Sequence, residues 1–322
     1  MPLNHKKVAV IIAAWNAQGT ISRAIASALD QPETAEVIVV DDGSTDETKR
    51  IVLGFIRKDT RVSLFEQDGN RGPSAARNLA ISYSRSEYFA VLDADDFFLP
   101  GRFQGLFSFD GWDAIADNIA FVPETSVKNF DATHLTHRIP DPQILDLASF
   151  IEGNISKPSS PRGELGFIKP VIRRAFLDEH QIRYDENLRL GEDYALYTQM
   201  LVAGAIFITL KSCGYIAVER ETSLSGKHQT EDLANLLAFD QRLEARNIIQ
   251  GAGRRALVRH AAQIEAKLFH RKILDAKRMH GIRKAFVEVV RKPLAAPGLV
   301  SAVLRDKLRS PVPVTKEVRY LF

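Results

Sequence analysis

The sequence has almost no cysteine and no long apolar segment. Cys213 is the only cysteine among 322 residues, which excludes an intrachain disulfide framework and a cysteine-based zinc site. The thiol lies near Ile208 and Ile216 and is expected to be a small packing residue, in keeping with a reducing compartment. Residues 1–7 lack the apolar stretch of a signal peptide, and no run of about 18 apolar residues occurs. We therefore expect a cytoplasmic protein without a membrane span.

Two widespread nucleotide-binding motifs are also missing. No Gly-x4-Gly-Lys-Ser/Thr segment occurs, and no Gly-x-Gly-x-x-Gly follows the first apolar run, which argues against a P-loop NTPase and a dinucleotide-dependent dehydrogenase. The composition is that of a globular protein, with 45% apolar and 26% charged residues. The length suits one large α/β domain with additional helices, or two smaller domains.

Charge is unevenly distributed along the chain. The net charge is only +3, but residues 251–322 contain 17 Lys and Arg against 5 Asp and Glu, which leaves 26 against 35 in residues 1–250. An acidic body followed by a basic region suggests that the basic region meets an anionic partner.

The first hundred residues alternate between two patterns. Short apolar runs typical of buried strands are separated by segments in which apolar residues have helical spacing. Strands are predicted at 8–14, 36–40, 62–65 and 88–92, and helices at 20–29, 73–84 and from a cap at Ser44 or Thr45 to about residue 57. This alternation predicts a mostly parallel sheet with helices on both faces, in which ligands bind beyond the carboxyl ends of the strands.

The rest of the chain is less regular. Strands are predicted within 109–122, at 205–210 and at 215–218, and short helices at 171–180 and 193–204. Residues 156–163 are rich in Pro, Ser and Gly and are expected to form a loop. Residues 230–291 are expected to be largely helical, and residues 292–322, with four prolines, to be a loose extension.

The acidic run Leu92-Asp93-Ala94-Asp95-Asp96 follows the fourth predicted strand. Carboxylates there can hold Mg²⁺ or Mn²⁺, and the cation can bind two phosphate oxygens of a substrate. The alternative is a solvated turn after a strand. The position of the run at a strand end in an α/β frame favours the metal site.

Three further clusters contain candidate residues. Asp41-Asp42-Gly43-Ser44-Thr45-Asp46 follows the second strand, where a carboxylate can accept from a base or a ribose; helix capping is the alternative. Arg77 lies in a predicted helix and can meet a base or a phosphate, or pair with a carboxylate at the surface. Asp193, in Gly191-Glu192-Asp193-Tyr194, can act as a general base or merely cap a helix.

Taken together, these clusters resemble family 2 glycosyltransferases, which are inverting enzymes with the GT-A fold. The likeness covers roughly residues 6–220 and extends to bacterial exopolysaccharide transferases, including succinoglycan-type glycosyltransferases. Five segments carry it, in the order and spacing of the family: Val8 to Asn16, Val37 to Asp46, Ala75 to Asn78, Leu92 to Asp96, and Gly191 to Asp193.

The resemblance implies a particular architecture. It is an α/β, GT-A fold, with a Rossmann-like, mostly parallel central sheet, flanking helices and a helical C-terminal extension. The catalytic domain would comprise residues 1–225, with a nucleotide-binding half at 1–100 and an acceptor half at 101–225. A basic, mainly helical region at 226–322 would follow.

The resemblance also implies roles for the matching residues. The metal would be held by Asp95, and the catalytic base would be Asp193. Trp15 would lie against the base and Asp42 would accept from it, although Ala13 replaces a residue that is often polar or Pro in relatives. Contacts with the nucleotide would come from Ala13, Trp15, Asp42, Arg77, Asp93 and Ala94.

The implied reaction moves one sugar from a nucleotide-diphosphate sugar to an acceptor hydroxyl. The default donor is UDP-linked, with UDP-glucose as the first candidate, and the product would belong to exopolysaccharide or surface-glycan synthesis. The Gln-x-x-Arg-Trp motif of processive family members is absent, because Trp15 and Trp112 are the only tryptophans, so single-sugar addition is expected. His228 is a candidate for a further metal or phosphate contact, with a surface histidine as the alternative.

Two rival hypotheses concern the whole protein. A sugar nucleotidyltransferase usually has a Gly-rich, basic loop where this chain has Trp15-Asn16-Ala17-Gln18-Gly19. A non-catalytic nucleotide-sugar-binding protein would have no need to keep both Asp95 and Asp193.

The basic region leaves its own alternatives open. Residues 254–292 contain 12 Lys and Arg, 3 Asp and Glu, and interleaved apolar residues. Such a helix can lie on an anionic membrane, which would suit a polyprenyl-diphosphate-linked saccharide acceptor and a peripheral location at the inner face of the cytoplasmic membrane. Alternatively, its apolar face packs on the catalytic domain. It could also serve a homodimer, whereas the lack of a recognition motif argues against nucleic acid.

Overall fold

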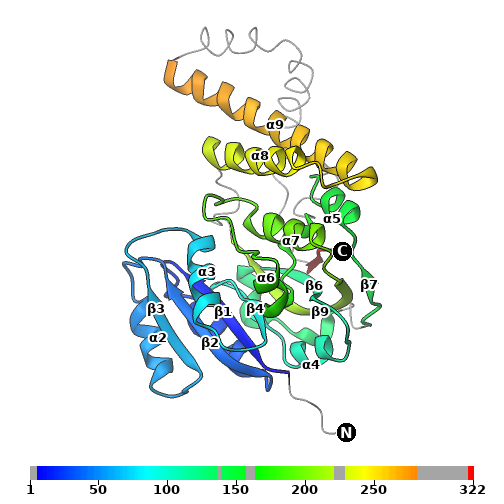
Figure 1. Ribbon diagram of the computed structural model, residues 1–322. Coiled ribbons are helices and arrows are strands. Elements are labelled where there is room, and N and C mark those ends of the chain that lie inside the picture. The colour runs from blue at the N-terminus through cyan, green and yellow to red at the C-terminus, as the bar shows by residue number, and fades with distance from the viewer. Residues whose placement is uncertain (1–5, 136–138, 157–163, 221–228, 281–317) are drawn as a thin grey trace.

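The computed structural model describes residues 6–135, 139–156, 164–220, 229–280 and 318–322 (Figure 1). All strands of these described ranges belong to one ten-stranded sheet with helices around it. The predicted α/β class is therefore confirmed. No helix in the described ranges is long and apolar enough to cross a membrane.

The first half of the sheet consists of four parallel strands. They are β1 (Val8–Ala14), β2 (Thr34–Asp41), β3 (Val62–Glu66) and β4 (Tyr88–Val91), and they lie in the order β3-β2-β1-β4. The predicted strands are all present. β1 and β4 are nearly all apolar because both faces of this half are covered.

Three helices connect these strands: α1 (Ile21–Leu29), α2 (Thr48–Ile56) and α3 (Pro73–Tyr83). Parallel crossovers are right-handed, so the return from β3 to β4 places α3 on the face opposite to α1 and α2. The strand order reverses between β1 and β4. Such a switch point opens a crevice at the carboxyl ends of its strands, so the loops after β1 and β4 are where a ligand is expected.

The second half of the sheet is mixed. Its strands are β5 (Phe97–Phe98), β6 (Ala114–Pro123), β7 (Gln143–Ile144), β8 (Val171–Arg173), β9 (Phe207–Glu219) and β10 (Arg319–Tyr320). The order continues as β4-β8-β6-β9-β5, with β7 on β9 and β10 on β6. β8 is antiparallel to both β4 and β6, so the parallel arrangement ends at β4.

The remaining helices surround the second half and cover one end of it. They are α4 (Arg102–Phe107), α5 (Leu147–Gly153), α6 (Arg174–Glu179), α7 (Glu192–Val202), α8 (Thr230–Ala245) and α9 (Gly251–His280), with 3-10 turns η1 (Glu124–Asn129), η2 (Ala132–His134) and η3 (Leu165–Phe167). α8 and α9 lie together above α5 and α7 (Figure 1). Leu257, Ile264 and Leu268 of α9 belong to the same hydrophobic core as β1.

The predicted cap at Ser44 or Thr45 is wrong. α2 begins at Thr48, after Glu47, whose side chain makes no capping hydrogen bond. Ser44 Oγ instead accepts from the backbone N–H of Asn16 at 2.9 Å, and the backbone N–H of Thr45 donates to Asn16 Oδ1 at 2.8 Å. These bonds join the loops after β1 and β2, and a hydroxyl used in a loop is not available to a helix end.

Other local predictions need correction. Residues 171–173 form β8 rather than the start of a helix, because the β-branched pair Val171-Ile172 fills the gap between β4 and β6. The two strands predicted at 205–210 and 215–218 are one strand, β9, which has an irregular register opposite Asp117 and Asn118. Residues 318–322 are not loose, because β10 pairs with β6 and Leu321 is buried. The predicted boundary at 225/226 lies outside the described residues.

Candidate active site

Trp15 follows β1 at the switch point. Its side chain is 44% exposed, so its ring is available to a planar ligand. Ala13, near the end of β1, is half-buried. Asn16 has a left-handed backbone (φ 49°), which its bonds to Ser44 and Thr45 hold in place. The loop that presents Trp15 is therefore fixed by the loop after β2.

Asp42 is buried in the loop after β2. Its Oδ1 accepts the backbone N–H of Arg71 at 2.7 Å, and its Oδ2 accepts that of Gly72 at 2.9 Å. These bonds fix the turn before α3, and Gly72 adopts the left-handed φ of 94° that this turn requires. Each carboxylate oxygen keeps a second lone pair, so Asp42 can still accept from a nucleoside. That contact stays a prediction.

The acidic run separates into a buried and an exposed end. Asp96 is buried and accepts from Tyr215 Oη and from the backbone N–H of Val218, each at 2.8 Å. Asp95 leaves 41% of its side chain exposed, with Arg220 Nη1 3.9 Å from its Oδ2. Ala94, between the two ends, is half-buried. Asp96 therefore anchors the run to β9, while Asp95 can meet a ligand.

Asp93 and Asp193 are joined by two buried cations. Arg77 Nη2 donates to Asp93 Oδ1 at 2.9 Å, and its Nη1 donates to Asp193 Oδ1 at 3.1 Å. Lys169 Nζ lies 2.9 Å from Asp93 Oδ2 and 2.8 Å from Asp193 Oδ2. These four side chains form a closed ring, called the charge ring below, in which each carboxylate offers one oxygen to each cation. Only Asp93, at 34% exposure of its side chain, reaches solvent appreciably.

Two more side chains complete the surroundings of Asp193. Tyr184 Oη donates to Asp193 Oδ1 at 3.1 Å, and the Arg77 guanidinium lies over the Tyr184 ring, 5.3 Å from its centroid. Glu192 Oε1 accepts from Arg77 Nη1 at 3.0 Å. The charge ring thus connects α3 and the turn after β4, in the first half of the fold, with α7 and the segment before β8, in the second half.

Burial and nearby charges shift the pKa of several groups in and around the charge ring. Burial alone would raise the pKa of Asp93, but Lys169 and Arg77 lower that pKa to about 2. Burial likewise opposes the charge of Lys169, yet Asp193 and Asp93 raise its pKa above the usual value. Burial and the neighbouring Asp193 raise the pKa of Glu192, and burial and Asp93 raise that of Asp95. Glu192 and Asp95 therefore carry the less compensated negative charges of the site.

Several residues of the site were not predicted from the sequence. Lys169 belongs to the charge ring, and Tyr184 and Glu192 contact its members. The sequence signal for Lys169 was a single lysine within the otherwise apolar segment Leu165 to Val171, and Glu192 stood in the motif around Asp193 without a role of its own. The alternative readings of two predicted residues are also corrected. Arg77 does pair with carboxylates, but it is buried and not at the surface. Asp193 is no N-cap, because Gly191 holds that position.

The carboxylates near Asp95 bear on the predicted metal site. No cluster of three His, Cys, Asp or Glu suited to a metal ion occurs in the described part of the chain, and His228 lies outside it. A divalent cation on Asp95 would therefore take its other ligands from a substrate diphosphate and water, as Mg²⁺ commonly does. The exposed, poorly compensated carboxylate of Asp95 fits such a cation.

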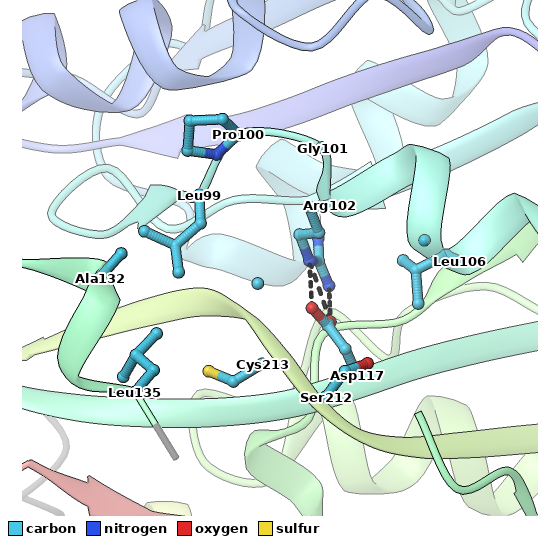
Figure 2. Close-up of a pocket in the computed structure, with 12 residues that line it drawn as sticks. Leu99, Pro100, Gly101, Arg102, Leu106, Asp117, Ala132, Leu135, Ser212 and Cys213 are labelled. Atoms are coloured by element: carbon cyan, nitrogen blue, oxygen red, sulfur yellow. Dashed lines mark hydrogen bonds and ion pairs between the residues drawn. The ribbon is translucent and has the colours of Figure 1, made fainter. Parts of the chain in front are cut away.

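A separate cavity of about 290 Å³ lies among residues 99–106, 132–135 and 212–214 (Figure 2). The buried pair of Arg102 and Asp117 forms part of its wall, with Arg102 Nη2 2.7 Å from Asp117 Oδ1. Burial and Asp117 raise the pKa of the Cys213 thiol to about 12. The thiol is therefore protonated at neutral pH, as expected for a packing residue. No predicted site residue lines this cavity.

Comparison with known proteins identifies the family. The sequence model of Glycosyl transferase family 2 matches residues 9–176. The chain belongs to glycosyltransferase family 2. It is 45% identical to the succinoglycan biosynthesis protein ExoU of Rhizobium meliloti (strain 1021), over 98% of this chain and 94% of ExoU. The chain is therefore a glycosyltransferase.

Two further likenesses concern shorter or more distant relatives. A segment covering 29% of this chain is 38% identical to a segment covering 36% of WfaP, the UDP-Glc:α-D-GlcNAc-diphosphoundecaprenol β-1,3-glucosyltransferase of Escherichia coli. The crystal structure of S. aureus TarS 1–349 in complex with UDP-GlcNAc is similar with a TM-score of 0.61 and 20% identity, over 92% of this chain and 79% of TarS. That structural likeness shows the GT-A fold of this family 2 member.

Proposed function

We propose that this family 2 member is an inverting enzyme that moves one sugar from a UDP-sugar to an acceptor hydroxyl in exopolysaccharide or surface-glycan synthesis. The observation that carries the proposal is the charge ring, which holds Asp193 of the second half beside Asp93 at the switch point of the first half. Direct displacement needs a base held close to the bound donor, and the sheet edge at the switch point is where the donor is expected. The names of ExoU and WfaP support the glycan product and the UDP-glucose donor.

The donor would occupy the loops after β1 and β4. Trp15 would stack on the base, with Ala13 and Asp42 behind it, and Asp93 and Ala94 would face the ribose. Both Nη atoms of Arg77 donate to carboxylates, so Arg77 would contribute to the nucleotide site indirectly, by holding Asp93 in place. Arg220 Nη1 lies 3.9 Å from Asp95 Oδ2, its Nε lies 3.1 Å from Glu124 Oε1, and its Nη2 is buried without a hydrogen-bond partner among the described residues. We therefore assign the Arg220 side chain to the diphosphate.

The reaction would be a single displacement. Asp193 takes the proton of the acceptor hydroxyl as the acceptor oxygen bonds to the anomeric carbon, from the side opposite the nucleotide. The bond from that carbon to the diphosphate breaks at the same time, and UDP leaves with the electron pair. Asp95 would hold Mg²⁺ or Mn²⁺, whose charge would offset that of the departing diphosphate. One base suffices because no covalent intermediate with the protein forms.

The donor is identified by a thermal-shift screen of UDP-glucose, UDP-GlcNAc and other nucleotide sugars, with Mn²⁺, with Mg²⁺ and with a chelator. A true donor raises Tm in proportion to RT ln(1 + [L]/Kd), and the rise should shrink with the chelator or in Asp95→Asn. Release of UDP with an undecaprenyl-diphosphate-linked saccharide then tests transfer. A nucleotidyltransferase would instead consume a nucleoside triphosphate and release pyrophosphate, and a non-catalytic protein would bind without turnover.

Replacement of Trp15 by Ala is expected to weaken donor binding at least about fivefold, because base–aromatic stacking contributes about 1–3 kcal/mol. Stability should be nearly unchanged, since Trp15 is 44% exposed. Isothermal titration with the donor found in the screen measures the change. Tyr83→Ala, at another exposed aromatic residue, is the matched control and should bind donor normally. Unchanged affinity in Trp15→Ala would remove Trp15 from the nucleotide site.

The acceptor proposal includes a membrane-bound saccharide. WfaP acts on a diphosphoundecaprenol-linked acceptor by its name, and α9 carries a run of exposed cations. The apolar residues Leu257, Ile264 and Leu268 are buried against the rest of the protein, so they are not available to lipid. We therefore propose that the exposed basic face of α9, with Leu274 and Met279 at its far end, meets an anionic membrane surface.

Flotation with vesicles containing about one third phosphatidylglycerol tests this surface. Four charge reversals on α9 should lower the bound fraction severalfold, since each basic residue contributes about 1 kcal/mol near an anionic surface. The variant reverses exposed Arg255, Lys272, Lys277 and Arg278. The matched control reverses exposed Lys49, Arg57, Lys58 and Arg85 of the first half. Equal binding by both variants, or no binding by the unmodified protein, would end the membrane proposal.

A further inference from the structure

We propose that Lys169 is a positioning residue that holds the carboxylate of Asp193 in place for the acceptor, and that removing its charge disables the base without emptying the donor site. The catalytic part of this inference rests on the proposed function. The structural part, a buried charge balance centred on Lys169, does not.

The two oxygens of Asp193 have different partners. Oδ1 accepts from Arg77 Nη1 and from Tyr184 Oη, each at 3.1 Å. Oδ2 accepts from Lys169 Nζ at 2.8 Å, and this is its only hydrogen bond within the part of the chain that the structure describes. Oδ2 therefore keeps a free lone pair for an acceptor proton, while Lys169 sets the direction in which that lone pair points. A carboxylate without Lys169 would be free to rotate about its remaining bonds on Oδ1.

The local charge balance explains why a lysine is buried here. The groups that face Asp193 are Arg77 from α3, Lys169 from before β8, Tyr184, Glu192 from its own helix, and Asp93 across the ring. Three carboxylates thus meet two cations. Without Lys169 they would meet one, which would leave uncompensated negative charge in the interior beside Asp193.

The position of Lys169 is itself fixed. Tyr197 Oη, one turn beyond Asp193 on α7, donates to the carbonyl of Ile168 at 3.1 Å. The next carbonyl, that of Lys169, accepts from Arg102 Nη2. The lysine side chain therefore starts from a backbone held on both sides. Its Nζ spans two carboxylates at nearly equal distance, which suits a compact ammonium.

The first test compares Lys169→Met with Lys169→Arg in kcat for UDP release and in donor Kd. In Lys169→Met, kcat should fall at least about tenfold because Asp193 Oδ2 loses the bond that directs it, while donor Kd should change much less because Asp93 keeps its bond to Arg77. Lys169→Arg keeps the charge and a donor for Asp193, and should recover much of the lost kcat. Lys211→Met, which removes an exposed partner of Asp141, is the matched control. An unchanged kcat in a folded Lys169→Met enzyme, or a loss of donor binding as large as the loss of kcat, overturns the inference.

The second test needs no substrate. Lys169→Met should lower Tm by about 5–10 °C, since it leaves a buried carboxylate excess. Adding Asp193→Asn removes one negative charge, so the double variant should lose less than the sum of the two single losses. Strictly additive losses would contradict the charge balance. If no donor is turned over by the unmodified enzyme, the proposed function fails while this cycle still decides the role of Lys169.

Discussion

Replacement of Asp193 by Asn is expected to nearly abolish sugar transfer while donor binding persists. The amide has the same shape and can still accept from Arg77 and Tyr184, but it cannot take up the acceptor proton. General-base catalysis typically contributes about 10²–10⁴-fold, so kcat should fall by at least two orders of magnitude. The measurement pairs initial rates of UDP release with donor Kd from calorimetry. Full transfer activity would remove Asp193 from the base position.

The neighbouring carboxylate supplies the decisive comparison. Glu192 shares Arg77 with Asp193 and has a raised pKa, so on ionisation alone it also qualifies as a base. We expect Glu192→Gln to retain much more activity than Asp193→Asn, because Glu192 lacks the bond to Lys169 that directs Asp193 Oδ2. The reverse ranking would exchange their roles. Asp178→Asn, which breaks an exposed pair with Arg183, controls for general effects of losing a carboxylate.

The sequence predicts the first half of the fold well because its elements are local. β1, β2 and β4 are continuous apolar runs, and such runs can be recognised without knowing their neighbours. The second half depends on contacts between distant segments. Val171 to Arg173 becomes a strand only because β4 and β6 leave an open edge between them, and nothing in a six-residue window records that edge.

The site divides in the same way. Trp15, Asp42 and Asp95 follow strands directly, so a parallel sheet brings them to one edge and their motif can be read along the chain. Lys169 has no such mark. It reaches Asp93 and Asp193 only because β8 inserts beside β4, which places residues separated by 76 positions in sequence, Asp93 and Lys169, within 2.9 Å. A buried lysine must be neutralised, but the sequence does not say by which carboxylates.

Replacement of Asp240 by Ala is expected to cause the largest loss of stability. Asp240 lies on α8 with no exposed surface; its Oδ1 accepts from Tyr194 Oη at 3.0 Å, and its Oδ2 lies 2.6 Å from His260 Nδ1. The substitution leaves both partners buried without their hydrogen-bond acceptor, which should lower the free energy of unfolding by about 3–5 kcal/mol. Urea unfolding measures this cost. Glu244→Ala, which removes an exposed pair between the same two helices, should cost less than about 1 kcal/mol.

This network also connects the basic region to the base. Tyr194 directly follows Asp193 on α7, while His260 belongs to α9. If α8 and α9 are structurally part of the catalytic unit, Asp240→Ala should lower transfer activity together with stability. Deletion of residues 251–322 should then destabilise the catalytic domain itself. If instead Asp240→Ala costs less than about 1 kcal/mol and transfer is unchanged, the helices fold as a separate unit and the boundary predicted near residue 225 is a true domain boundary. The shared core of β1, Leu257 and Leu268 favours the first outcome.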